Sequence, residues 1–130
     1  MKVGVDLIEI ARIERALERY PAFRERCFTE AERAYCDSRP RPAESYAGRF
    51  AGKEAVGKAL GTGLTRGPQG LAVKTLDQAT GRILVELGDD MAADHRELAT
   101  APIVVHSLRQ EDFVVATTLC EQEVSDDDPA

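Results

Sequence analysis

Residues 43–63 read AESYAGRFAGKEAVGKALGTG. The sequence before this segment predicts mainly helices, and the sequence after it predicts mainly strands. A long helix is predicted over residues 43–60. Gly61 is placed to end that helix in a left-handed conformation. The RPRP segment at residues 39–42 predicts a loop, because its prolines prevent a helix there. The long helix is therefore bounded at both ends by segments that do not continue it.

Upstream of this helix, the sequence predicts one strand and two further helices. Residues 2–7 (KVGVDL) are Val-rich and predict a strand with Asp6 at its end. Residues 8–20 predict a helix that Pro21 stops. A TEAE capping-box pattern begins a short helix over residues 30–36.

Downstream of the long helix, the pattern changes to strands. Residues 71–76 and 82–87 predict a hairpin around a DQATG loop. Residues 89–98 predict a short polar helix, and residues 103–108 and 113–119 predict a second hairpin around RQED. Early helices and late strands indicate an α+β fold, in which helices pack on an antiparallel-rich sheet.

Length and composition indicate the class of protein. The 130 residues suit one small domain, expected over residues 1–120 and followed by an acidic, disordered tail at 121–130. A core of this size leaves apolar surface that association of subunits would cover. The sequence has no charged-then-apolar leader and no apolar run of about 18 residues, so we expect neither export by such a signal nor a membrane span. The unpaired spacing of the cysteines favours idle thiols in a reducing cytoplasm over a disulfide framework or a zinc site; these are Cys27, Cys36 and Cys120.

The net charge of −6 is unevenly distributed. Residues 1–66 carry 13 Lys and Arg against 10 Asp and Glu, whereas residues 67–130 carry 4 against 13. A basic surface for a partner would therefore lie in the first half of the chain. The overall acidity argues against nucleic acid as the main ligand.

Residues 49–63 hold the densest set of candidate functional side chains. Glu54 and Lys58 are four residues apart and share one helix face, while Lys53 is adjacent and Arg49 lies four residues before it. A carboxylate among cations beside a Gly-rich helix end suits a metal–phosphate site, in which Glu54 holds Mg²⁺ and the cations meet phosphate oxygens. The alternative is an ordinary surface Glu–Lys pair beside a helix stop.

Asp6 is a second carboxylate, in an otherwise apolar opening segment. It could be a Mg²⁺ ligand that faces Glu54. It could equally be the N-cap of the first helix. The residues alone leave both interpretations open.

The first helix has an apolar stripe and a basic stripe on nearly opposite faces. Apolar side chains recur at Ile10, Ile13 and Leu17. Basic side chains recur two residues later, at Arg12, Arg15 and Arg19. The basic stripe either binds an acidic partner or is a solvated face whose field nearby glutamates dilute.

Four segments, taken together and in order, resemble the holo-acyl-carrier-protein synthases, the small-subunit class of phosphopantetheinyl transferases. VGVDLIEIARI (3–13) looks like that family's glycine–Asp strand and first helix, and FTEAE (28–32) like its short second motif. RFAGKEAVGKALGTG (49–63) is the most specific match, and IVVHSLRQEDFVVATTL (103–119) resembles the last motif. The likeness covers nearly the whole predicted domain.

The resemblance implies a role for each matching residue. Asp6 and Glu54 match the Mg²⁺ carboxylates of the family, and this match replaces the N-cap and surface-pair alternatives. Lys58 matches the helix lysine linked to phosphate binding and leaving-group protonation. The coenzyme A neighbourhood is matched by Arg49, Phe50, Lys53, Lys58, Gly61, Thr62 and Gly63. Contact with the carrier protein is implied for Arg12, and the stripe extends it to Arg15 and Arg19.

The resemblance also implies a reaction and an assembly. A serine of an acidic acyl carrier protein attacks the coenzyme A pyrophosphate at the phosphate nearer pantetheine, and 3',5'-ADP leaves. Glu54 is the candidate base, directly or through water, and Lys58 neutralises or protonates the leaving phosphate. Members of the family are homotrimers with active sites between subunits. Carriers of fatty acid, polyketide and peptide synthesis are all compatible with this sequence.

The last motif departs from the family pattern. The family usually has a Ser there and, a few residues on, a His; without gaps these fall on His106 and Arg109. An arginine can still meet a phosphate, so Arg109 is an expected contact of coenzyme A. The departure also supports a second hypothesis, a non-catalytic or repurposed relative that binds carrier protein or coenzyme A within a biosynthetic complex.

Overall fold

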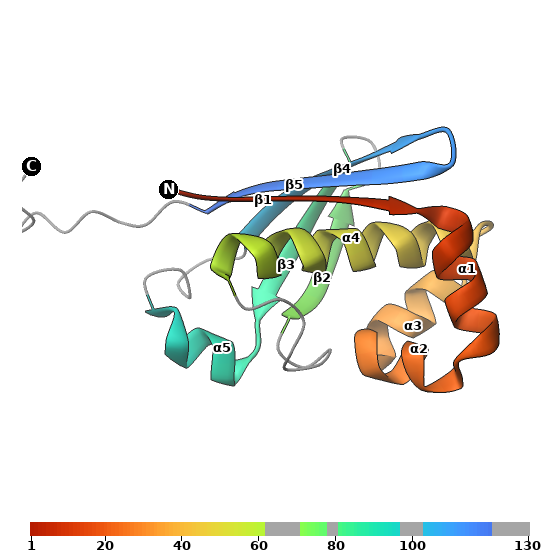
Figure 1. Cartoon of the computed structure of the whole chain (residues 1–130). Coiled ribbons are helices and arrows are strands. Elements are labelled where there is room, and N and C mark those ends of the chain that lie inside the picture. The colour runs from red at the N-terminus through yellow and green to blue at the C-terminus, as the bar shows by residue number, and fades with distance from the viewer. Residues whose placement is uncertain (62–70, 78–80, 97–102, 121–130) are drawn as a thin grey trace, which may run out of the picture.

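The computed structural model describes residues 1–61, 71–77, 81–96 and 103–120, and these form an antiparallel sheet crossed by one long helix (Figure 1). The five strands follow the order β1-β5-β4-β3-β2, and every neighbouring pair is antiparallel. The strands are β1 (Lys2–Glu9), β2 (Leu71–Asp77), β3 (Arg82–Leu87), β4 (Ile103–Gln110) and β5 (Phe113–Cys120). The predicted α+β class, with helices on an antiparallel sheet, is confirmed.

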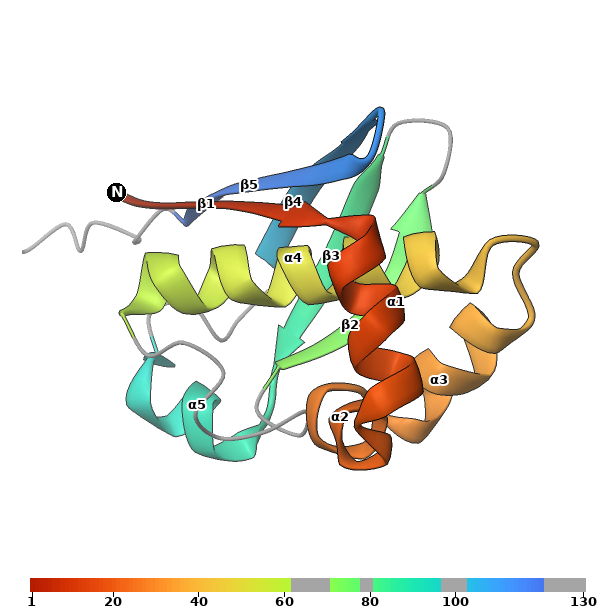
Figure 2. The ribbon, with the colours of Figure 1, turned by 45° about the vertical axis from the view of Figure 1, so that its right-hand side comes forward.

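The long helix lies across the sheet, and three shorter helices gather near one end of it (Figures 1 and 2). The helices are α1 (Ile10–Arg19), α2 (Pro21–Cys27), α3 (Glu30–Asp37), α4 (Pro42–Leu60) and α5 (Asp89–Asp94). Among the described residues, no helix has the length and apolar character needed to cross a bilayer.

Helix α4 lies at the centre of the core, and the small residues on its buried side allow it to pack closely on the sheet. Ala47, Ala51 and Ala55 are fully buried there. Small side chains let the sheet come close to the helix, most of all at Gly4 of β1. A Cβ at Gly4 would lie 1.7 Å from the carbonyl oxygen of Ala55, so only glycine fits at this crossing.

The strand β1 alternates between the two faces of the sheet. Gly4, Asp6 and Ile8 are buried. Val3, Val5 and Leu7 point away from α4 and are between 50% and 60% exposed. Leu108 of β4 and Leu119 of β5 are also exposed, and Leu119 pairs with Val3. We call this surface the apolar sheet face; it consists of Val3, Val5, Leu7, Leu108 and Leu119.

Two predictions at the start of the chain were wrong. The strand β1 pairs with β5 as far as Glu9, so α1 begins at Ile10 and not at residue 8. Asp6 therefore lies within the strand, and Glu9 takes the N-cap position of α1. The N-cap interpretation of Asp6 is excluded. Pro21 does follow the end of α1, but it also begins α2, because the first position of a helix suits proline.

Two predicted helix ends are confirmed, and the lengths of two other elements differ from the prediction. Thr29 and Glu32 form the capping box of α3, with both reciprocal hydrogen bonds present. Gly61 ends α4 with a left-handed φ of 78°. The polar helix α5 is shorter than predicted, and the last hairpin is longer, with its turn at Glu111 and Asp112. Residues 78–80 of the DQATG loop and the predicted acidic tail lie outside the described residues.

Candidate functional site

The strand β1 and the helix α4 bring Asp6 and Lys58 into contact. Asp6 points toward α4 because strand side chains alternate, and it is only 9% exposed. The ammonium of Lys58 donates to Asp6 Oδ1 at 2.9 Å and to the carbonyl oxygen of Val5 at 3.3 Å. Glu54 lies one helical turn before Lys58, so it shares the face that looks toward Asp6.

The two carboxylates influence each other electrostatically. Partial burial, and then the charge of Asp6, raise the pKa of Glu54, while Lys58 acts in the opposite direction. The hydrogen bond from Lys58 to Asp6 raises the pKa of the lysine. Asp6 Oδ2 is buried and has no hydrogen-bond partner among the described residues. An unsatisfied carboxylate oxygen beside a second carboxylate is a suitable environment for a cation.

The chemistry of this donor set fits Mg²⁺. Among the described residues, no group of three or more His, Cys, Asp or Glu is arranged to hold a metal. Within the described part of the chain, the protein ligands at this site are therefore limited to two carboxylates, those of Asp6 and Glu54. Mg²⁺ usually takes one or two carboxylates from a protein and fills its other positions with water and substrate phosphate.

A groove of about 590 Å³ opens beside these carboxylates, next to α1. We call it the carboxylate pocket; its functional lining is Asp6, Glu54, Phe50, Arg12, Arg15 and Arg19. The three arginines are exposed, whereas Ile13 on the opposite stripe is buried, so the predicted orientation of α1 is confirmed. Phe50 packs against Phe23, with ring centroids 5.7 Å apart, and gives the groove an apolar wall.

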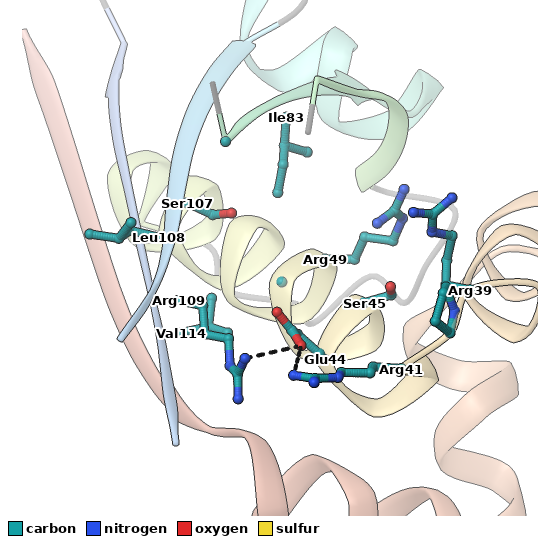
Figure 3. Close-up of a pocket in the computed structure, with 13 residues that line it drawn as sticks. Arg39, Arg41, Glu44, Ser45, Arg49, Ile83, Ser107, Leu108, Arg109 and Val114 are labelled. Carbon is teal, nitrogen blue, oxygen red and sulfur yellow. Dashed lines mark ion pairs between the residues drawn. The ribbon is translucent and has the colours of Figure 1, made fainter. Parts of the chain in front are cut away.

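A second cavity, of about 600 Å³, lies against the first turns of α4 and the strands β3 and β4 (Figure 3). We call it the arginine pocket, because Arg39, Arg41, Arg49 and Arg109 all line it. Figure 3 shows Glu44 between Arg41 and Arg109, with Arg39 and Arg49 on the other side. The Glu44 carboxylate is 3.9 Å from Arg41 and 3.7 Å from Arg109, distances typical of loose ion pairs.

Arg49 and Arg109 differ in how firmly they are held. Arg49 is only 4% exposed, and its guanidinium lies 4.0 Å from the ring centroid of Tyr35. Its Nε is buried without a hydrogen-bond partner among the described residues. Arg109 is more exposed and donates from Nε to the carbonyl oxygen of Glu111. Alternation in β4 places Ser107 and Arg109 at this pocket, whereas His106 is not among its lining residues.

Lys53, predicted to lie near coenzyme A, has a different environment. Its side chain is fully buried, pairs with Glu32 at 2.7 Å, and donates to the carbonyl oxygen of Cys27 at 2.9 Å. Burial lowers the pKa of Lys53, and the charge of Glu32 opposes that change. Lys53 has no exposed surface with which a ligand could make contact, and it ties the region of α3 to α4.

Three residues that the structure brings into these sites were not predicted from the sequence. Arg39 and Arg41 were assigned only to a loop, yet both line the arginine pocket. The available signal was that an arginine directly precedes each of the two prolines. Glu32 was identified as a capping residue, and its second role as the counter-ion of Lys53 depends on how α3 packs on α4. Thr62 and Gly63 lie outside the described residues.

The two pockets lie on different sides of α4. Gly48 lines the arginine pocket and Phe50 lines the carboxylate pocket. These residues are two positions apart, which is about 200° around a helix. Within one chain, the carboxylates of Asp6 and Glu54 therefore do not face the same space as the four arginines of the arginine pocket.

Comparisons with known proteins agree over nearly the whole chain. The family model described as the 4'-phosphopantetheinyl transferase superfamily matches residues 2–118. A holo-[acyl-carrier-protein] synthase from Moorella thermoacetica is 41% identical over 127 residues, which cover 98% of each chain. The crystal structure of the Neisseria meningitidis holo-[acyl-carrier-protein] synthase matches with a TM-score of 0.76 and 25% identity, covering 93% of this chain and 98% of that one. A Chronobacterium ammoniagenes ACPS–CoA complex matches with a TM-score of 0.73 and 25% identity, covering 95% and 98%.

Proposed function

The chain belongs to the 4'-phosphopantetheinyl transferase superfamily, and we propose that it transfers 4'-phosphopantetheine from coenzyme A to a serine of an apo acyl carrier protein, releasing 3',5'-ADP. The observation that carries this proposal is the meeting of Asp6, Glu54 and Lys58 beside a groove with a basic rim. Relatives named holo-[acyl-carrier-protein] synthase, and a related structure with CoA, support this donor and this acceptor.

Asp6 and Glu54 would hold one Mg²⁺, which when bound would neutralise charge on the coenzyme A pyrophosphate. The unpartnered oxygen of Asp6 and the raised pKa of Glu54 support this assignment, because a cation stabilises both ionised carboxylates. Lys58 is half exposed, so its ammonium can leave Asp6 and turn toward a bound phosphate.

Glu54 is our candidate for the base. A raised pKa favours acceptance of the proton of the serine hydroxyl, directly or through one water. The serine oxygen then attacks the phosphorus nearer pantetheine, and the bond from that phosphorus to the 3',5'-ADP oxygen breaks. Lys58 stays protonated and would offset the negative charge that develops on the leaving phosphate.

The arginine pocket would bind the phosphates at the nucleotide end of coenzyme A. Guanidinium groups suit this task because they can donate two parallel hydrogen bonds to one phosphate. Arg49 and Arg109 were expected contacts, and the position of Arg41 beside them supports its addition. We keep Gly61, Thr62 and Gly63 as contacts on the basis of the sequence motif alone, and Phe50 as a contact near the pantetheine end.

The active site would be completed by two subunits of a homotrimer. The two pockets lie on different sides of α4. A coenzyme A molecule that contacts both kinds of pocket would therefore use the arginine pocket of one chain and the carboxylate pocket of its neighbour. The apolar sheet face supports association, since water-exposed Val and Leu on adjacent strands are typical of a contact surface. Sedimentation should give one species near three times 14.2 kDa, and a strictly monomeric active enzyme would exclude this assembly.

The acidic carrier would dock along Arg12, Arg15 and Arg19. These arginines line the carboxylate pocket, so a carrier bound there would present its serine close to Glu54. Opposite charges on the two proteins would speed their encounter. We place this reaction in the cytoplasm, where coenzyme A is available and where free thiols such as Cys36 stay reduced.

The direct test is the intact mass of a purified apo carrier protein after incubation with this protein, coenzyme A and Mg²⁺. The carrier should gain one phosphopantetheine, and EDTA should stop the gain. Asp6→Ala and Glu54→Gln should each remove most of the activity while the fold is kept. Metal-independent transfer, or full activity in both variants, would exclude the two-carboxylate site. Coenzyme A binding with no mass gain would favour the non-catalytic relative instead.

A further inference from the structure

Helix α4 has a glycine, Gly48, whose presence the described structure does not require. Gly48 lies inside the helix, well away from both ends. It is not among the described glycines with a left-handed φ, which are Gly61 and Gly81. Apart from its chain neighbours and the nearby backbone of its own helix, a Cβ added at Gly48 would meet no described atom within 4 Å. At Gly4, in contrast, an added Cβ would run into backbone at 1.7 Å.

Glycine in a helix interior needs a reason, because it favours the helix less than alanine does. Backbone conformation and close packing are the two usual reasons, and neither applies to Gly48 among the described residues. The remaining reason for a glycine at position 48 is the space that the absent side chain leaves open. That space belongs to the arginine pocket, of which Gly48 forms part of the lining.

The surroundings of Gly48 indicate which part of a ligand this space would accept. The backbone N–H groups in the middle of a helix are already bonded within it, so Gly48 offers an anion no donor. It offers an uncharged surface, and Ile83 and Val114 add apolar side chains to the same lining. The guanidiniums of Arg49 and Arg109 lie elsewhere in this lining, where phosphates would bind.

We propose that Gly48 is a specificity-determining residue that leaves room for the adenosine of coenzyme A to lie against α4. This inference rests on the proposed function, since it assigns the uncharged, flat part of the same donor to the same pocket. The missing side chain is then the feature that selects the nucleotide. An added methyl group at this position would occupy the volume that the nucleoside needs.

Gly48→Ala tests this inference because its two expected effects have opposite signs. The variant should unfold about 2–4 °C higher than the wild type, as alanine stabilises a helix interior. Its dissociation constant for 3',5'-ADP, measured by calorimetry, should rise about tenfold, because the added methyl would occupy volume that the bound nucleoside fills. Its affinity for inorganic pyrophosphate, which lacks the nucleoside, should stay as in the wild type.

Gly52→Ala is the matched control on the same helix. Its Cβ would contact Ile83 and Val105 at ordinary distances of 3.6 and 3.7 Å, in the core between α4 and the sheet. This control should gain similar thermal stability and should bind 3',5'-ADP as the wild type does.

Several outcomes would overturn the inference. If the wild type transfers phosphopantetheine and Gly48→Ala still binds 3',5'-ADP equally well, only the role of Gly48 is wrong. Equal loss of pyrophosphate affinity would mean that the arginines moved, and a changed oligomeric state would mean that a second copy of the chain fills the space. If the wild type neither binds 3',5'-ADP nor performs the transfer, the proposed function fails and this inference fails with it.

Discussion

Replacement of Lys53 by Met tests the buried ion pair between α4 and α3. The Lys53 and Glu32 side chains are 0% and 1% exposed, with their charged atoms 2.7 Å apart. Methionine keeps the apolar stem of lysine but leaves Glu32 without a counter-ion, and the Cys27 carbonyl loses a donor. Removal of one partner from a buried pair costs about 3–5 kcal/mol. That is a large share of a total stability of about 5–15 kcal/mol.

Equilibrium unfolding in urea, followed by circular dichroism, measures this loss. The double variant Lys53→Met with Glu32→Gln is the matched control, because glutamine is uncharged and keeps the oxygen that accepts from the Thr29 N–H. We expect the double variant to regain at least about 1 kcal/mol relative to Lys53→Met, since no unpaired charge stays buried. The reasoning is refuted if Lys53→Met unfolds like the wild type while its affinity for coenzyme A falls.

Three further predictions concern the two pockets. In metal-free buffer, Glu54→Gln should raise the melting temperature at pH 7: burial and Asp6 raise the pKa of Glu54, so its ionised form disfavours folding. This gain should shrink as the pH falls through that pKa, where Glu54 is itself neutral, and an equal gain at pH 4 would contradict the assignment. Arg109→Ala should weaken coenzyme A binding by about 1–3 kcal/mol, and Arg109→His should restore part of it; calorimetry showing unchanged affinity in the alanine variant would remove Arg109 from the site. Arg12→Glu combined with Arg15→Glu should sharply raise the KM for the carrier and flatten its salt dependence, with little change in coenzyme A affinity; an unchanged KM would place carrier docking elsewhere.

The features that sequence predicted well are those fixed by a few neighbouring residues. Thr29 and Glu32 are three positions apart and make their capping box within one turn. Gly61 ends α4 through its own backbone conformation. The arginines of α1 are exposed because the apolar stripe of the same helix is buried. In each case, the determining contacts lie within a single element.

The features that sequence missed depend on contacts between distant elements. Lys53 is next to Glu54 in the chain, but α3 covers Lys53 fully and leaves Glu54 only partly buried. Arg41 is part of a pocket only because β4 brings Arg109 beside the start of α4. The end of β1 at Glu9 depends on pairing with Phe113, more than a hundred residues away. A pattern of neighbouring residues does not show which distant elements will come into contact.

Gly4 has a consequence for how mutational data on this protein would be interpreted. Any side chain at Gly4 would push β1 away from α4, and Asp6 lies two residues further along the same face of that strand. The carboxylate of Asp6 would then move away from Glu54 and Lys58, although every functional group would still be present. A mutational scan scored by activity alone would count Gly4 among the residues that perform the chemistry. Its actual contribution would be the spacing of two layers, which a measurement of the distance between Asp6 and Lys58 in such a variant would reveal.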